Sequence, residues 1–257
     1  MTLEEAFALR EREIISLIGG GGKTTLMFAL GRELATRRKG VLLTTTTKIR
    51  NPEPSDEFAL FLSARVEKVT EWIGENLDRY RYLLIAQDKL DNGKLQGIPP
   101  NWTFGLFSIP GVSCMIIEAD GAAGRPLKAP REGEPVVAEE TTLLIPMVGI
   151  DALGKPLQED NVFRSRIAAE ILKESEGTEI KEAMIGRLLA AALQNKPGDA
   201  RVIPFINKID LPGGLEKGRS LARTLLDSIS PEIERVVLGR AREVPIVKEI
   251  IARSTSL

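Results

Sequence analysis

Short apolar stretches alternate with amphipathic stretches along the chain. The apolar stretches are rich in branched residues and fit buried strands at residues 13–18, 41–47, 82–86, 112–119, 143–148, 201–206 and 233–238. Between them, apolar residues recur at helical spacing over residues 24–38, 66–77, 161–173, 179–193 and 215–229. Strands that alternate with helices indicate parallel pairing, with helices on both faces of the sheet. We therefore expect a three-layer α/β/α fold with a mostly parallel sheet, formed by residues 1–257 as a single domain.

Glycine, proline and asparagine mark the connections between these elements. Two prolines predict a loop at 51–55, and Asn92-Gly93 indicates an exposed hairpin or loop within 87–100. The longest connection, residues 121–135, is rich in glycine and proline and begins directly after an acidic strand end. We expect its residues 122–135 to be mobile, as a switch segment would be.

The composition narrows the possible functions. Of the 257 residues, 43% are hydrophobic and 28% are charged, and the formal net charge is −1. Without an excess of basic residues, the chain lacks the signature of a protein that binds nucleic acid or an acidic membrane. The first residues include many charges, and no apolar run is long enough to span a bilayer. We expect a cytoplasmic protein without nucleic-acid or membrane partners.

The scarcity of soft ligands limits the metal chemistry. The chain has no histidine and a single cysteine, Cys114, so an intramolecular disulfide is impossible. Sites for zinc, nickel or copper built from histidine and paired cysteines are therefore excluded. We expect any metal to be a hard cation bound by hydroxyl, carboxylate and phosphate oxygens, which indicates Mg²⁺.

A glycine-rich loop follows the first predicted strand and opens the first predicted helix, which is the context of a phosphate-binding P-loop. Glycines allow backbone N–H groups to approach phosphate oxygens, and the helix N-terminus adds positive partial charge. We expect Lys23 to bridge the β- and γ-phosphates and the hydroxyl of Thr24 to bind Mg²⁺. The fold is then that of a P-loop NTPase, and the residues that bind GTP or ATP are Gly19, Gly20, Gly21, Gly22, Lys23, Thr24 and Thr25.

The loop departs from the full Walker A pattern, because Leu17 occupies the position of its first glycine. It is a shortened form, similar to the loops of Mur-type ligases and of some P-loop GTPases. Taken alone, the loop is compatible with ATPases, kinases, ligases and GTPases. A plain glycine turn between a strand and a helix is the alternative without a function.

A second candidate element is the acidic end of the strand at 112–119. Glu118 and Asp120 stand two positions apart, so both side chains can point to the same side and reach a Mg²⁺ ion beside the P-loop. Glu118 with Gly121 resembles the Glu-x-x-Gly signature of GTPases that assemble metallocentres and cofactors. There the glycine N–H can meet the γ-phosphate. Which of the two carboxylates binds Mg²⁺ stays open, and an ordinary acidic turn is the alternative.

A candidate for base recognition follows the strand at 201–206. Asn207, Lys208 and Asp210 match the Asn-Lys-x-Asp element of P-loop GTPases. In that element the aspartate accepts hydrogen bonds from guanine, the lysine stem packs on the base, and the asparagine ties the loop together. Because adenine presents the wrong donors to such an aspartate, the motif favours GTP over ATP. A helix-capping turn is the alternative.

Threonines and cations near the predicted phosphate site supply further candidates. The hydroxyls of Thr44–Thr47 can reach Mg²⁺ or the attacking water, although threonine is also simply a good strand former. Arg125 and Lys128 lie in the loop after the acidic strand, where they can stabilise charge on the transferred phosphoryl group or bind a second substrate. Arg164 is a weaker candidate for the same role. The candidates for catalytic roles are therefore Lys23, Glu118, Asp120 and Arg125.

Taken together and in this order, the elements resemble the YqeC family, described as accessory proteins of selenium-dependent molybdenum hydroxylases. The resemblance rests on 19–25, 44–49, 118–130, 149–157 and 207–210, of which the segment Glu-Ala-Asp-Gly-Ala-Ala-Gly-Arg-Pro-Leu-Lys-Ala-Pro is the most specific. It covers nearly the whole chain. Residues 149–157 form a family-like block to which the sequence assigns no mechanism. One position departs from the pattern: Phe163, before Arg164, stands where we expect histidine, so no role is carried over through it.

The resemblance implies a role in maturing or inserting a selenium-containing molybdenum cofactor, with a molybdenum hydroxylase or its maturation machinery as the partner. Three functions remain open from the sequence. The first is a Mg²⁺-dependent NTPase switch that assists enzyme maturation. The second is an ATP-dependent ligase or transferase with a Mur-like loop, and the third is a nucleotide-binding scaffold that does not hydrolyse.

Overall fold

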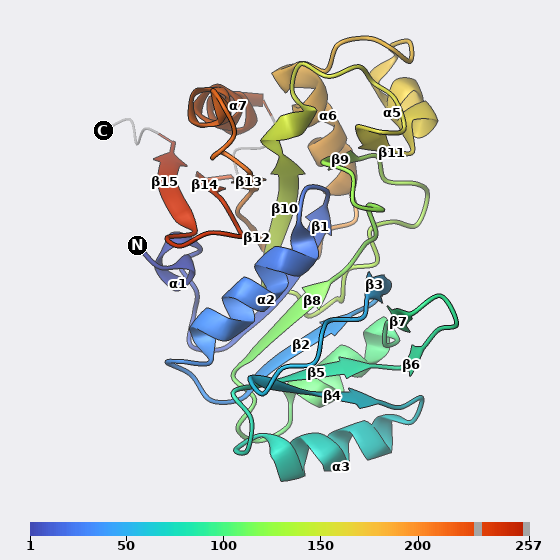
Figure 1. Cartoon of the computed structure of the whole chain (residues 1–257), viewed down its shortest axis with the longest axis vertical. Helices are drawn as coiled ribbons and strands as arrows, with labels where there is room; N and C mark the ends of the chain where they lie inside the picture. Colours follow the sequence, from blue (N-terminus) through green and yellow to red (C-terminus); the bar gives the residue numbers. More distant parts are fainter. Residues whose placement is uncertain (229–232, 254–257) are drawn as a thin grey trace.

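The computed structural model of the chain, which describes residues 1–228 and 233–253, is built on one large, mostly parallel sheet (Figure 1). Every neighbouring pair of its strands is parallel except β14 and β15, which are antiparallel. Its strand order is β15 (Val247–Ala252), β14 (Arg235–Gly239), β13 (Phe205–Asn207), β10 (Leu143–Gly149), β1 (Glu13–Gly19), β8 (Cys114–Glu118), β2 (Val41–Thr45), β5 (Tyr82–Ala86) and β4 (Phe58–Leu62), with β12 (Arg201–Val202) also paired to β10.

Helices cover both faces of this sheet and complete the predicted three-layer fold. In β1, Ile15 and Leu17 belong to the apolar cluster that contains α2 on one side, whereas Ile14 and Ile18 belong to the cluster on the other side, which includes residues of α3 and Ala192 of α6. A strand buried on both faces carries a continuous apolar run, as β1 does. The helices are α1 (Leu3–Ala6), α2 (Lys23–Leu34), α3 (Val66–Asn76), α4 (Thr103–Phe107), α5 (Ser165–Leu172), α6 (Glu182–Ala192) and α7 (Gly214–Ser228), with 3₁₀ turns η1 (Pro100–Trp102) and η2 (Ile150–Ala152).

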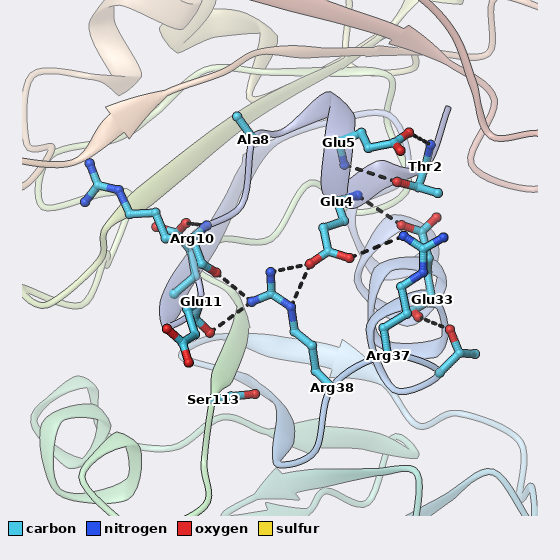
Figure 2. Close-up of polar contacts among 12 residues, drawn as sticks. Thr2, Glu4, Glu5, Ala8, Arg10, Glu11, Glu33, Arg37, Arg38 and Ser113 are labelled. Carbon is cyan, nitrogen blue, oxygen red and sulfur yellow. Dashed lines mark hydrogen bonds and ion pairs between the residues drawn. The ribbon is translucent and has the colours of Figure 1, made fainter.

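The short helix α1 is fixed to the C-terminal end of α2 by polar contacts (Figure 2). Glu33 of α2 accepts hydrogen bonds from the backbone N–H groups of Leu3 and Glu4, which have no partner inside α1. Arg38, just beyond α2, pairs with the carboxylate of Glu4 and donates to the carbonyl group of Arg10 at 2.6 Å. These contacts hold the start of the chain against the C-terminal end of α2, which is the end away from the glycine loop.

Two small sheets lie beyond the main one. β3 (Lys48–Arg50), β7 (Lys94–Gln96) and β6 (Asp88–Lys89) form an antiparallel three-stranded sheet. β9 (Leu127–Lys128) and β11 (Val162–Phe163) pair in parallel. Each of these small sheets joins segments that follow different strands of the main sheet. Distant parts of the chain therefore meet at the C-terminal end of the parallel strands. Within the described residues, no helix is both long enough and apolar enough to cross a membrane.

Most predicted elements occur close to their expected bounds, and the differences have local causes. The strand expected at 201–206 is split into β12 and β13 around Pro204, which cannot donate a backbone hydrogen bond to a neighbouring strand. The helix expected at 161–173 begins only at Ser165, because residues 162–163 form β11. Strands β3, β4, β9, β11 and β15 and helices α1 and α4 were not predicted. Residue 229, the last of the helix expected at 215–229, lies outside the described residues.

Candidate functional site

The glycine loop lies between β1 and α2, at the C-terminal end of the sheet's central strand. Gly19, Gly21 and Gly22 have φ values of 91°, 79° and 118°, a backbone conformation that residues with a Cβ rarely adopt. Gly22 is the N-cap of α2, and no side chain caps this helix. Since the first N–H groups of a helix lack intrahelical acceptors, those at the start of α2 are available to an anion.

Two segments from other strands pack against the loop and use part of its hydrogen-bonding capacity. The N–H of Gly20 donates to the carbonyl of Met147, and the N–H of Gly21 donates to the carbonyl of Arg125, both at 2.9 Å. A Cβ on Gly20 would stand 2.8 Å from that same Arg125 oxygen. The N–H groups of these two residues are therefore already hydrogen-bonded within the fold. Their glycines are needed because neighbouring backbone approaches so closely.

The predicted lysine and hydroxyl meet the acidic end of β8. Lys23 Nζ lies 2.5 Å from the Gly19 carbonyl oxygen, 3.0 Å from Asp120 Oδ1 and 4.0 Å from Glu118 Oε1. The Thr24 hydroxyl donates a 2.6 Å hydrogen bond to Glu118 Oε2. Both carboxylates thus lie beside the loop, but Glu118 contacts Thr24 while Asp120 contacts Lys23.

Glu118 occupies an environment that opposes its charge. It is only 6% exposed, and burial raises its pKa, while Lys23 and the hydrogen bond from Thr24 act in the opposite direction. The net effect is a raised pKa, because the loss of water outweighs these contacts. A cation bound next to this carboxylate would therefore be favoured, since it would replace the missing solvation.

The donor set at Thr24 and Glu118 fits Mg²⁺. It combines one hydroxyl and one carboxylate oxygen, and Mg²⁺ in nucleotide sites takes one or two such ligands together with phosphate oxygens and water. Among residues 1–228 and 233–253, no group of three or more histidine, cysteine, aspartate or glutamate residues could hold a metal ion by itself.

A chain of charges leads from the loop into the segment after β8. Asp120 Oδ2 accepts from the Gly19 N–H and lies 3.0 Å from Lys128 Nζ, which in turn lies 2.7 Å from Glu134 Oε2. Arg164 donates to both oxygens of Glu134, at 2.6 and 2.8 Å. Burial alone raises the pKa of Glu134, but the hydrogen bonds from Arg164 and Lys128 outweigh it and lower the pKa to about 2.

This charge chain changes the interpretation of the loop predicted to be mobile at 122–135. Residues 126–129 of that loop are buried, and β9 within it pairs with β11. Lys128 is 4% exposed and faces two carboxylates rather than the cavity. The prediction of a mobile segment is therefore not supported for this part of the loop. Arg125 lines the cavity, but its guanidinium donates to the Glu159 carbonyl at 2.7 Å.

The threonines at the end of β2 have structural partners. The hydroxyl of Thr44 donates to the Ile85 carbonyl, and the hydroxyl of Thr45 donates to the Glu118 carbonyl, each at 2.8 Å. The Thr46 hydroxyl donates to a carbonyl of the segment after β9. The bonds of Thr44 and Thr45 tie β2 to β5 and β8, so the hydroxyl protons of these three threonines have structural acceptors.

The Asn-Lys-x-Asp element lies at the other side of the loop. Asn207 Nδ2 donates to the Gly21 carbonyl at 2.7 Å, and its Oδ1 accepts from the Ala241 N–H at 2.8 Å. Lys208 lines the cavity and pairs with Asp151 at 2.6 Å. Asn207 thus ties the glycine loop to the turn after β14, as the motif predicts. Asp210 is exposed and is not among the cavity-lining residues.

The family-like block at 149–157 begins at the end of β10 and continues through η2. The Gly149 N–H donates to the Pro126 carbonyl at 2.8 Å, and a Cβ on Gly149 would contact Asp151 and Pro126. Asp151 is the ion-pair partner of Lys208. The block therefore supports the glycine loop from the side of β10 and holds the lysine of the base-recognition candidate.

The glycine loop, Glu118, the start of the segment after β8 and Lys208 border one cavity of about 740 Å³, a volume typical of ligand pockets. Its basic residues Arg50, Lys94 and Arg242 were not predicted as site residues from the sequence. Lys48 and Arg50 alternate with buried Ile49, a pattern that could have marked a strand with one polar face. The lining residues are Gly21, Gly22, Lys23, Thr24, Thr25, Phe28, Lys48, Ile49, Arg50, Asn51, Pro52, Glu53, Lys94, Glu118, Gly121, Ala122, Ala123, Gly124, Arg125, Lys208 and Arg242.

Comparison with known proteins identifies the family. The sequence profile of the YqeC protein family matches residues 15–166, which is more than half of the chain. The chain belongs to the YqeC family. It is also similar to the uncharacterized protein YqeC of Escherichia coli strain K12, with 27% identity over 243 residues that cover 93% of this chain and 92% of that protein.

The YqeC match contains most of the described geometry. Residues 15–166 include the glycine loop, the acidic end of β8 and the charge chain as far as Arg164. The Asn-Lys-x-Asp element at 207–210 lies beyond the match. The loop and its acidic partners are therefore features of the part of the chain that defines its membership of the YqeC family.

Proposed function

We propose that this protein binds a Mg²⁺-bound nucleoside triphosphate at the loop Gly19–Thr25 and hydrolyses it. One observation carries the proposal: the Thr24 hydroxyl and the Glu118 carboxylate meet at 2.6 Å beside a helix start with unoccupied N–H groups. In P-loop NTPases, a Mg²⁺ ion that is bound to the phosphates takes a hydroxyl ligand and a carboxylate close to the loop lysine, and Thr24 and Glu118 offer these two groups beside Lys23.

Each group has a defined part in this proposal. The N–H groups at the start of α2 bind the phosphates, and Lys23 moves from Asp120 to the β- and γ-phosphates. Thr24 and Glu118 would hold Mg²⁺, which when bound neutralises charge that develops on the transferred phosphoryl group. Asp120 keeps its contact with the Gly19 N–H and with Lys128, so it fixes the loop while Lys23 is engaged.

GTP is the favoured nucleotide in this proposal. The support is the contact of Asn207 with both the glycine loop and Ala241, and the position of Lys208 in the cavity wall. These contacts support a position of the Asn-Lys-x-Asp element next to the glycine loop, with Asp210 two residues after Lys208 in sequence. Asp210→Asn should then lower the ratio of GTP to ATP affinity, and an unchanged ratio would exclude Asp210 as the base-reading residue.

We further propose that nucleotide turnover serves the maturation of a selenium-dependent molybdenum hydroxylase, the role implied by the family resemblance. Because Cys114 is buried and histidine is absent, the soft metal of such a cofactor would belong to the partner. Co-purification of the chain with such a hydroxylase, tested with Mg²⁺ and a GTP analogue or GDP, checks this role. Equal recovery in both nucleotide states would argue against a nucleotide switch.

Calorimetric titration with Mg²⁺ and GTP or ATP, followed by phosphate-release assays, tests the core proposal. Lys23→Ala should abolish binding, and Thr24→Val should remove the dependence on Mg²⁺. Thr36→Val is the matched control, because its hydroxyl lies beyond the end of α2 and donates to the Glu33 carbonyl. Binding without phosphate release would identify a scaffold, and release only with an added acceptor would identify a transferase or ligase.

A further inference from the structure

The cavity has a second basic region that is separate from the glycine loop. Lys48 and Arg50 of β3 and Lys94 of β7 line it, and Arg50 lies directly opposite Lys94 in the antiparallel pairing. Ile49 and Leu95, which alternate with them, are buried in the core. The small sheet thus has one apolar face that anchors it and one basic face, called here the basic wall (Lys48, Arg50 and Lys94).

The order of strands gives the basic wall its place relative to a bound nucleotide. β13, which carries Asn207, lies on one side of β1, while β8 and β2 lie on the other. β3 begins three residues after β2 ends, and a Cβ on Gly121 would stand 3.7 Å from the Thr47 hydroxyl oxygen. The basic wall is therefore on the Glu118 side. It lies opposite to the proposed base position and beside the end of the triphosphate that carries the γ-phosphate.

The charges of the basic wall are not used within the fold. Three of the four other cations that line the cavity have carboxylate partners: Lys23 pairs with Asp120, Lys208 with Asp151 and Arg125 with Asp160, whereas Arg242 has none among residues 1–228 and 233–253. In the described part of the chain, no carboxylate lies within ion-pair distance of Lys48, Arg50 or Lys94, although Glu53 also lines the cavity. The whole chain has a net charge of −1, so this local excess of positive charge does not follow from a basic composition.

We propose that the basic wall binds a second small molecule that carries a phosphate or carboxylate group, next to the γ-phosphate of the nucleotide. An arginine between two lysines suits an oxyanion, since its planar donors bind two oxygens and the lysines supply point charges. The inference rests on the proposed function for the first ligand and adds a second substrate to it. The cavity then holds two anionic ligands, one at the glycine loop and one at the basic wall.

The test separates the two ligands. The protein is saturated with Mg²⁺ and a non-hydrolysable GTP analogue and then titrated by calorimetry with inorganic phosphate and, separately, with malonate. The wall variant Lys48→Met/Arg50→Met/Lys94→Met is compared with Lys89→Met, which removes a cation from the same small sheet but not from the cavity lining. We expect the wall variant to weaken the second ligand on the order of tenfold or more while nucleotide affinity stays within about threefold.

Each outcome has a defined meaning. Loss of phosphate or malonate binding in the wall variant, but not in Lys89→Met, supports the inference and tells which oxyanion is preferred. No binding of either probe to the nucleotide-loaded wild type overturns it, as does a loss of nucleotide affinity in the wall variant without a second site. If the wild type binds no nucleotide, the proposed function fails. The same titrations of the nucleotide-free protein then show whether the basic wall binds phosphate or malonate without a nucleotide.

Discussion

Replacing Lys128 with methionine should destabilise the fold much more than replacing Arg131, although both cations pair with Glu134. Lys128 Nζ lies 3.0 Å from Asp120 and 2.7 Å from Glu134, and its side chain is 2% exposed. Methionine keeps the apolar stem but leaves two carboxylates without their shared cation in a site with little water. Removing one partner of a buried ion pair costs about 3–5 kcal/mol, so we expect a loss of this size in the free energy of unfolding.

Arg131 provides the matched comparison. Its Nε lies 2.8 Å from the other oxygen of Glu134, but its side chain is 64% exposed. Water and salt screen such a pair, and its contribution is about 0.2–1 kcal/mol. Urea unfolding of wild type, Lys128→Met and Arg131→Met, followed by circular dichroism, gives the three free energies and their m-values. Losses within about 1 kcal/mol of each other would show that burial does not govern the strength of these pairs.

Four further predictions concern Gly20, Gly74, Cys114 and Glu134. Gly20→Ala should abolish nucleotide binding in calorimetry, because its Cβ would stand 2.8 Å from the Arg125 carbonyl oxygen. Gly74→Ala in α3 meets nothing within 4 Å and should instead stabilise the fold to urea by about 0.5–1 kcal/mol. Burial raises the pKa of the Cys114 thiol to about 12, so iodoacetamide at pH 8 should label this thiol only in unfolded protein. Labelling is followed by mass spectrometry, and fast labelling of the folded protein would contradict this prediction. The lowered pKa of Glu134, about 2 against an ordinary 4.5, gives stability that is present above pH 4.5 and lost as pH falls towards 2. Glu134→Gln should flatten that part of the stability profile, and an identical slope in wild type and variant would refute the assignment.

Local sequence determined the elements whose environment is nearly uniform along their length. β1, β5, β8 and β10 are buried on both faces, so their apolar runs were sufficient to predict them. The glycine loop could also be predicted from local sequence, because its glycines and its lysine are adjacent in the chain. The edge strand β4 was missed because its residues are all only partly buried, which leaves neither an uninterrupted core run nor a clean alternation.

Tertiary structure decided which of these groups meet. Thr24 and Glu118 are 94 positions apart, and they meet because β8 pairs in parallel with β1 and ends at the same edge. Likewise, Lys128 could be read as a mobile loop cation until its partners Asp120 and Glu134 were placed around it. The sequence by itself determined the kinds of chemical group and the strands that carry them. The contacts that bury a charge or occupy an N–H group depend on how the strands and the loops after them are arranged, because residues far apart in sequence meet only where the fold brings them together.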